Sequence, residues 1–109
     1  IVDQVKDFSK DYKNILVCLD SMHTHDHVLK ELKAYSELVS IGSYCIVYDT
    51  FVEDIAEGFF NDRPWDVGDN PKTAVTEFMY NNPEFEIDHF IHNKLQITVA
   101  PNGFLKRIS

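Results

Sequence analysis

Three side chains suited to acid–base or metal chemistry follow two apolar segments of this sequence. Asp20 ends the segment 15–19, Asp49 ends the segment 44–48, and His23 stands three residues beyond Asp20. Carboxylate oxygens are ligands that Mg²⁺ prefers, and histidine titrates in the range that general-base catalysis needs. The pattern makes Asp20 and Asp49 candidate ligands of a divalent cation and His23 the candidate base. The alternatives are that both acids bond loop or helix amides and that His23 bonds the backbone.

Arg63 and Trp65 form a second candidate group, for substrate binding. An indole stacks on a sugar ring and a guanidinium hydrogen-bonds its hydroxyls. Both residues belong to the acidic, aromatic segment 50–70, whose length and lack of periodicity are typical of a functional lid. The alternative is a lid that only packs back on the sheet. We interpret its acids as a solvated loop rather than as a cation site.

The elements that must position these residues form a β-α-β unit. Both segments are apolar on two faces, which suits parallel strands with helices on each side, and residues 24–39 have a helical apolar face that Thr24 would cap. Open parallel sheets place ligands at the carboxyl ends of their strands. Asp20 and Asp49 should therefore lie about 5 to 10 Å apart on one edge, with Tyr48 pointing away. Like charges this close should raise the pKa of one carboxyl if no cation is present.

The remaining elements are predicted from helical and alternating patterns. Residues 1–12 have one apolar helical face, and Asn70-Pro71 begins a helix that ends at 81–83. Alternation over 85–88 and 95–99 predicts an antiparallel hairpin, followed by a turn at 100–103 and a short tail. The other histidines are expected at solvent: His25, His27, His89 and His92.

Composition limits the classes of function. A chain of 109 residues suits a single domain, and 18 acids against 10 bases give a charge of −8, which disfavours nucleic acid as a partner. No apolar run has the roughly 20 residues of a membrane span. Cys18 and Cys45 lie in apolar runs, so we expect buried, unbonded thiols on neighbouring strands of a cytoplasmic protein. The chain begins with Ile1 inside a helix, and we interpret it as a piece of a longer protein.

The order of elements and three motifs resemble known proteins. The order is similar to the second half of the class I methyltransferase fold, in which the last strand inserts antiparallel beside its neighbours. The motifs D-S-x-H-T (residues 20–24), RPW…GDNP (63–71) and APNG (100–103) resemble the cephalosporin hydroxylase family, which includes rhamnosyl O-methyltransferase-like proteins. The resemblance covers roughly residues 14–107.

This resemblance implies an α/β fold with a partial Rossmann-like methyltransferase sheet: two parallel strands joined by a helix, then a helix and a C-terminal antiparallel hairpin. Residues 1–109 would be the C-terminal half of a single methyltransferase-like domain, inactive alone. The resemblance implies S-adenosylmethionine as cofactor, a sugar or small-molecule hydroxyl as acceptor, and Mg²⁺ held by the acids after the two strands. The glycine-rich cofactor loop would precede Ile1, because no G-x-G pattern occurs here, so no cofactor-binding residue is assigned.

Two other functions stay open. Family members of the hydroxylase type have an acidic pair where this chain has Tyr48-Asp49, and a phenol with a pKa near 10 is a poor Mg²⁺ ligand. The chain would then be a non-catalytic scaffold that has lost the metal site. The family name also suggests an oxidoreductase of the cephalosporin hydroxylase type, but an iron oxygenase normally needs two histidines and one carboxylate. A half sheet would also expose a strand edge, which predicts self-association.

Overall fold

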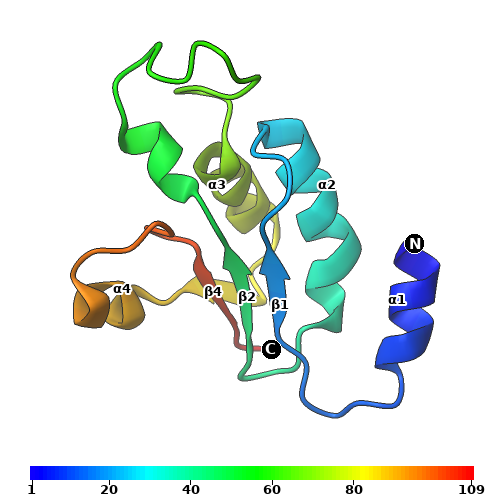
Figure 1. Cartoon of the computed structure of the whole chain (residues 1–109). Helices are drawn as coiled ribbons and strands as arrows, with labels where there is room; N and C mark the ends of the chain where they lie inside the picture. Colours follow the sequence, from blue (N-terminus) through cyan, green and yellow to red (C-terminus); the bar gives the residue numbers. More distant parts are fainter.

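The computed structural model describes residues 1–109 as a four-stranded mixed sheet with helices packed on it (Figure 1). In chain order the elements are α1 (Val2–Ser9), β1 (Val17–Leu19), α2 (His25–Tyr35), the 3₁₀ helix η1 (Ser36–Leu38), β2 (Tyr44–Val47), the 3₁₀ helix η2 (Thr50–Asp54), α3 (Pro71–Asn81), β3 (Phe85–Ile87), α4 (His89–Leu95) and β4 (Phe104–Arg107). The strand order is β1-β2-β4-β3, with β1 and β2 parallel and β4 antiparallel to both of its neighbours. The predicted α/β class and β-α-β unit are confirmed, as is the antiparallel insertion of the last strand.

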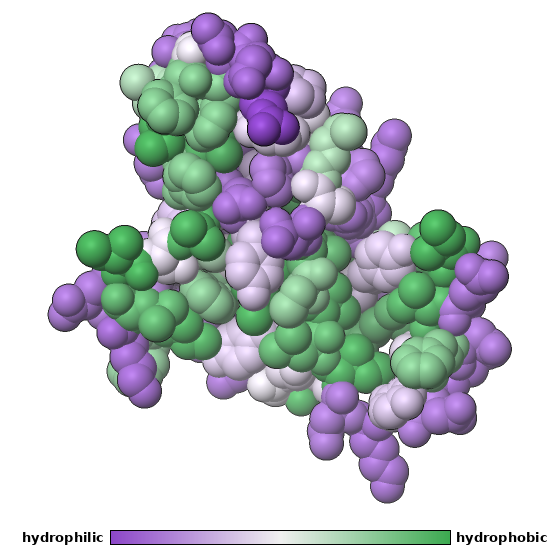
Figure 2. All heavy atoms as spheres, in the orientation of Figure 1, coloured by the Kyte–Doolittle hydropathy of each residue, from purple (hydrophilic) through white to green (hydrophobic).

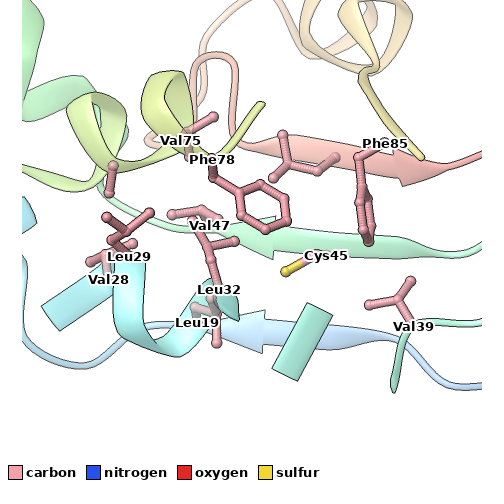
Figure 3. Close-up of a cluster of buried hydrophobic side chains, with 12 residues drawn as sticks. Leu19, Val28, Leu29, Leu32, Val39, Cys45, Val47, Val75, Phe78 and Phe85 are labelled. Carbon is pink, nitrogen blue, oxygen red and sulfur yellow. The ribbon is translucent and has the colours of Figure 1, made fainter. Parts of the chain in front are cut away.

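The hydrophobic core lies between the sheet and the pair α2 and α3. Twelve buried apolar side chains form it, and Figure 3 shows them converging from both helices onto the strands. Phe78 of α3 and Phe85 of β3 pack with their ring centroids 5.6 Å apart, and Leu105 of β4 is a fully buried member of the same cluster. Burying such side chains contributes about 1.5 to 3 kcal/mol each. The core therefore fixes the strands whose ends carry the candidate site.

The two core helices begin differently from one another. Asn70 caps α3 as predicted, and its side chain accepts hydrogen bonds from the amides of Lys72 and Thr73. Thr24 makes no such side-chain bond to α2. The Asp69 carboxylate takes over that function, accepting from the amide of His25 at 2.7 Å. The start of α2 is thereby attached to the segment that leads into α3.

The remaining helices contribute little to the core. No residue of α1 is buried, and an ion pair between Lys6 and Glu37 joins it to η1. The longest helices have 11 residues. None of the helices has the length and apolar character needed to cross a membrane, in line with the absence of a long apolar run in the sequence.

The prediction that both faces of the sheet are covered by helices is wrong. Successive strand residues face opposite sides, so Leu19, Cys45 and Val47 point into the core while Cys18 points to the other face and is exposed. Leu16, just before β1, is also 52% exposed. Figure 2 shows apolar side chains gathered over this part of the molecule. Cys18 is therefore not the buried thiol expected from its apolar neighbours.

The predicted C-terminal hairpin is half wrong. The segment 85–87 is a strand, but its partner is Phe104–Arg107, which was predicted to be a tail. Asp88 caps α4 through bonds from the amides of Phe90 and Ile91, so a helix occupies the expected connection and the first residue of the expected second strand. At Gly103 the backbone passes so close to Val47 that a Cβ atom would lie 2.2 Å from the Val47 carbonyl oxygen. This approach lets β4 insert beside β2.

We expect iodoacetamide at about pH 8 to alkylate Cys18 and to leave Cys45 intact in the folded chain. The two thiols are unbonded and lie on neighbouring strands, but burial raises the pKa of Cys45 to about 12. Only a thiolate reacts, and Cys45 has almost none at that pH. Peptide mass spectrometry measures both sites, with a urea-unfolded control in which both react. Equal labelling of the two cysteines in the folded chain would contradict this core.

Candidate active site

Asp20, His23 and Asp49 come together at the carboxyl ends of β1 and β2. Each offers one potential ligand atom, and these three atoms all lie within 4.8 Å of one another. His23 Nε2 is 2.9 Å from Asp49 Oδ2. The prediction that both acids share one edge of the sheet with His23 beside them is confirmed, and the groups lie slightly closer than expected.

Asp49 has a left-handed backbone conformation, which directs its side chain toward this cluster. β2 ends at Val47, and Asp49 has a φ of 59°, which costs a non-glycine residue about 1 kcal/mol or more. η2 begins at the next residue, where the buried Thr50 donates its hydroxyl to the Pro101 carbonyl at 2.6 Å. The loop before β4 thus holds this turn in place, and strain is localised at a candidate catalytic position.

The electrostatics of the cluster centre on Asp49. Burial raises the pKa of Asp49, His23 lowers it, and Asp20 raises it. The predicted effect of a neighbouring like charge is therefore present, although burial is the larger cause. When His23 Nε2 donates its proton to Asp49, Nδ1 is the ring nitrogen left to accept another. Asp49 can thus orient an imidazole base in the way that carboxylates orient histidines in hydrolases.

Arg63 and Trp65 stand beside the cluster as one wall of a pocket. The Trp65 ring meets the His23 ring edge-on, with centroids 4.7 Å apart, and the Arg63 guanidinium carbon lies 5.6 Å from the Trp65 centroid. The pocket has a volume of about 310 Å³, and its lining is completed by Asp49, Phe51, Val52 and Phe60. Sequence and structure therefore bring four of the five candidate residues to one cavity.

Asp20, the fifth candidate, faces a different cavity. It lines a groove of about 680 Å³ that runs along β1 between α1 and α2. Because its carboxylate also lies within 4.8 Å of the His23 and Asp49 groups, the cluster stands where groove and pocket meet. A molecule in each cavity could reach the same few atoms.

Tyr48 does not line the pocket of His23 and Asp49. Its phenol lies near the Cys18 thiol, whose negative form is the main reason that the pKa of Tyr48 is raised. Alternation along β2 accounts for this placement, because Tyr48 directly follows Val47, whose side chain points into the core. A neutral phenol on that side adds no ligand to the cluster.

The polar residues that hold this site together were not predicted from the sequence. His25 was expected at solvent, but its ring bonds Thr73 Oγ1 at 2.8 Å and Glu77 Oε2 at 2.6 Å, which joins α2 to α3. Glu53 and Asn70 bond one another at 2.8 Å beneath the loop that carries Trp65. Only the cap signal Asn70-Pro71 was visible in the sequence, because the partners stand 17 or more positions apart.

Comparison with known proteins identifies the family. The family model described as Rhamnosyl O-methyltransferase/CmcI matches residues 1–108. The chain belongs to this family. Relatives include the proteins named rhamnosyl O-methyltransferase of Mycobacterium tuberculosis (strain ATCC 25618 / H37Rv) and Mycobacterium bovis (strain BCG / Pasteur 1173P2), each 32% identical over 111 residues. The matched regions cover 98% of this chain and 42% of each relative, so the chain spans less than half of their length. No solved structure matches.

The donor set of the cluster fits a divalent cation. The potential ligand atoms of Asp20, His23 and Asp49 lie within 4.8 Å of one another, a spacing close to that of ligands around one Mg²⁺ ion. The carboxylates of Asp20 and Asp49 suit Mg²⁺ or Mn²⁺, and an imidazole is better tolerated by the latter. One histidine with two carboxylates differs from the two-histidine, one-carboxylate set of non-haem iron oxygenases. The cluster therefore offers no support for the oxidoreductase alternative.

Proposed function

We propose that residues 1–109 form the C-terminal part of an S-adenosylmethionine-dependent O-methyltransferase domain that acts on a sugar hydroxyl. Membership of the Rhamnosyl O-methyltransferase/CmcI family supports the reaction class. The observation that carries the proposal is the His23–Asp49 pair opening into a pocket walled by Trp65. The rest of the domain would supply the cofactor site, and the free thiols suit a cytoplasmic protein.

His23 is the general base in this proposal. S-adenosylmethionine, when bound, supplies an electrophilic methyl group on a sulfonium. Asp49 accepts the Nε2 proton of His23 and keeps Nδ1 free, and Nδ1 takes the proton of the acceptor hydroxyl as its oxygen bonds to the methyl carbon. When bound, the sulfonium would supply the leaving group, its sulfur keeping the electron pair of the carbon–sulfur bond. Asp49 then stabilises the imidazolium that has formed.

Asp20 and Asp49 would hold Mg²⁺ or Mn²⁺ at the same place, and that ion would orient and acidify the acceptor hydroxyl. The groove beside Asp20 and the pocket beside His23 supply separate approaches for donor and acceptor. In the pocket, the Trp65 ring offers a stacking surface for a sugar and Arg63 offers hydrogen-bond donors. Rhamnosyl groups are the acceptor suggested by the names of the relatives.

A non-catalytic scaffold is the second candidate, and Tyr48 favours it. Tyr48 stands where the resemblance to hydroxylase-type family members implies an acid, so the cation would have one protein carboxylate fewer. The two candidates differ in one observable property. The enzyme candidate transfers methyl groups through His23 and Asp49 even where the cation is weakly bound or absent, whereas the scaffold transfers none.

The test is a methyl-transfer assay on the complete protein with isotope-labelled S-adenosylmethionine and methyl α-L-rhamnopyranoside. We expect labelled methyl ether, with a lower rate after EDTA treatment that Mg²⁺ or Mn²⁺ restores. Product formation unchanged by EDTA would remove the cation from the proposal and keep His23. No transfer to this or to other glycosides, despite bound S-adenosylmethionine, would favour the scaffold.

A further inference from the structure

We propose that Asn70 and Glu53 form a latch that positions the pocket wall carrying Arg63 and Trp65, and so sets the affinity for the acceptor. The latch is the hydrogen bond from Asn70 Nδ2 to Glu53 Oε2, at 2.8 Å. This inference rests on the proposed function for its kinetic consequence. Its structural part, the order of the loop between η2 and α3, stands independently.

Asn70 is fully buried, and every polar atom of its side chain is used. Its oxygen accepts from the amides of Lys72 and Thr73 and caps α3. Its nitrogen donates to Glu53 Oε2 and, at 3.0 Å, to the carbonyl oxygen of Asp66. A cap alone requires only an acceptor, which serine or aspartate also provides. The two donated bonds are therefore a function that the cap does not explain.

Glu53 closes the loop from its other end. It belongs to η2, and its carboxylate also accepts from the amide of Gly68, at 3.0 Å and 3.3 Å. One carboxylate of η2 thus bonds both Gly68 and Asn70, which lie 15 and 17 positions further along the chain. Gly68 itself has a φ of 86°, which lets its amide turn toward Glu53.

Asp66 extends this arrangement into the loop. Its Oδ2 accepts from the amide of Gly58 at 2.8 Å, and its carbonyl is the second acceptor of Asn70. Asp66 and Asp69 also exchange two backbone bonds. The loop therefore has two closures. The outer one joins Glu53 to Gly68 and Asn70, and the inner one joins Gly58 to Asp66.

The pocket wall lies inside this closed loop. Phe60, Arg63 and Trp65 lie within the inner closure, between Gly58 and Asp66, and Trp65 reaches His23 from there. Few other contacts hold the segment, since Phe59 is 68% exposed and Arg63 is also exposed. Loss of the latch should loosen these side chains while leaving Asp20, His23 and Asp49 on their strands.

The variant Asn70→Asp tests the latch because it keeps the cap acceptor and the shape of the side chain. It removes both donated bonds and sets two carboxylates against one another. Glu53→Gln is the second variant, which places an amide against the Asn70 amide. In the double variant, the glutamine amide can donate to the aspartate oxygen and restore the bond in reverse. Asp54→Asn is the matched control, because Asp54 joins the same elements through an exposed ion pair with Lys72.

Two measurements are made on the complete protein. Hydrogen exchange with mass spectrometry should become about tenfold faster in peptides covering residues 55–69 of Asn70→Asp, and change little in β1 and β2. The KM for methyl α-L-rhamnopyranoside should rise about tenfold, with kcat and the KM for S-adenosylmethionine changed less than about threefold. Glu53→Gln should act in the same direction, the double variant should recover part of both effects, and Asp54→Asn should match the parent.

The outcomes separate the latch from the proposed function. Unchanged exchange in residues 55–69 of both single variants would overturn the latch, whatever the activity. Faster exchange with an equal loss in every kinetic parameter would overturn its role in positioning the acceptor pocket. If the parent protein transfers no methyl group, the proposed function fails, and the exchange data still decide the latch. If Asn70→Asp does not fold, Glu53→Gln alone decides.

Discussion

Replacing His23 with alanine is expected to lower kcat for methyl transfer roughly a hundredfold or more, the usual contribution of a general base. Its ring is the basic group that Asp49 orients at 2.9 Å in the pocket. Asp20→Asn should also lower turnover strongly, because it removes one of the two carboxylates available to a cation. Tyr48→Phe should stay within about threefold of the parent, since its phenol lies near Cys18 and outside the pocket. Steady-state kinetics with labelled S-adenosylmethionine measure all three.

His27→Ala is the matched control for His23→Ala. His27 stands on the first turn of α2, four residues from His23, and its ring bonds Ser21 and Glu31 instead of the cluster. Its removal should leave kcat within about threefold. Full activity of His23→Ala would assign the base elsewhere and strengthen the scaffold candidate.

The geometry of the cluster could be predicted because it depends on short-range patterns. Two apolar segments separated by a helical pattern determine parallel strands, and parallel strands bring their carboxyl ends to one edge. Asp20 and Asp49 occupy those ends, so their proximity follows without any knowledge of side-chain packing. The helix from Asn70-Pro71 was equally local, since cap and first turn lie within four residues.

The errors concern choices that distant residues decide. The alternation of Leu95, Ile97 and Val99 is a genuine strand pattern, yet these side chains are exposed because β4 already fills the place beside β2. The segment that pairs with β2 is determined by the close approach of Gly103 to Val47. The burial of Cys18 depends on whether anything covers the second face, which an apolar run of five residues does not specify. The pairing of Glu53 with Asn70 likewise has no local signature.

Residues 1–109 on their own are expected to give no measurable binding of S-adenosylmethionine and to self-associate. Binding should fail because the chain has no glycine-rich turn whose amides could hold the cofactor, its glycines being Gly42, Gly58, Gly68 and Gly103. Association should follow because β1 pairs only with β2 and presents its other edge to solvent beside the apolar groove. Isothermal titration calorimetry measures the first expectation, and sedimentation velocity measures the second.

A lysine beside the free edge of β1 should distinguish edge-to-edge strand pairing from nonspecific hydrophobic association. Leu16→Lys places a charge in the groove beside β1, where a pairing strand would have to bury it, so the variant should be monomeric at concentrations where the parent associates. Tyr80→Lys is the control, because Tyr80 is 90% exposed on α3 and lies outside the groove. It should associate as the parent does. Micromolar cofactor binding by a monomeric parent would contradict both expectations, and equal dissociation by the two lysine variants would show that charge, and not the β1 edge, controls the assembly.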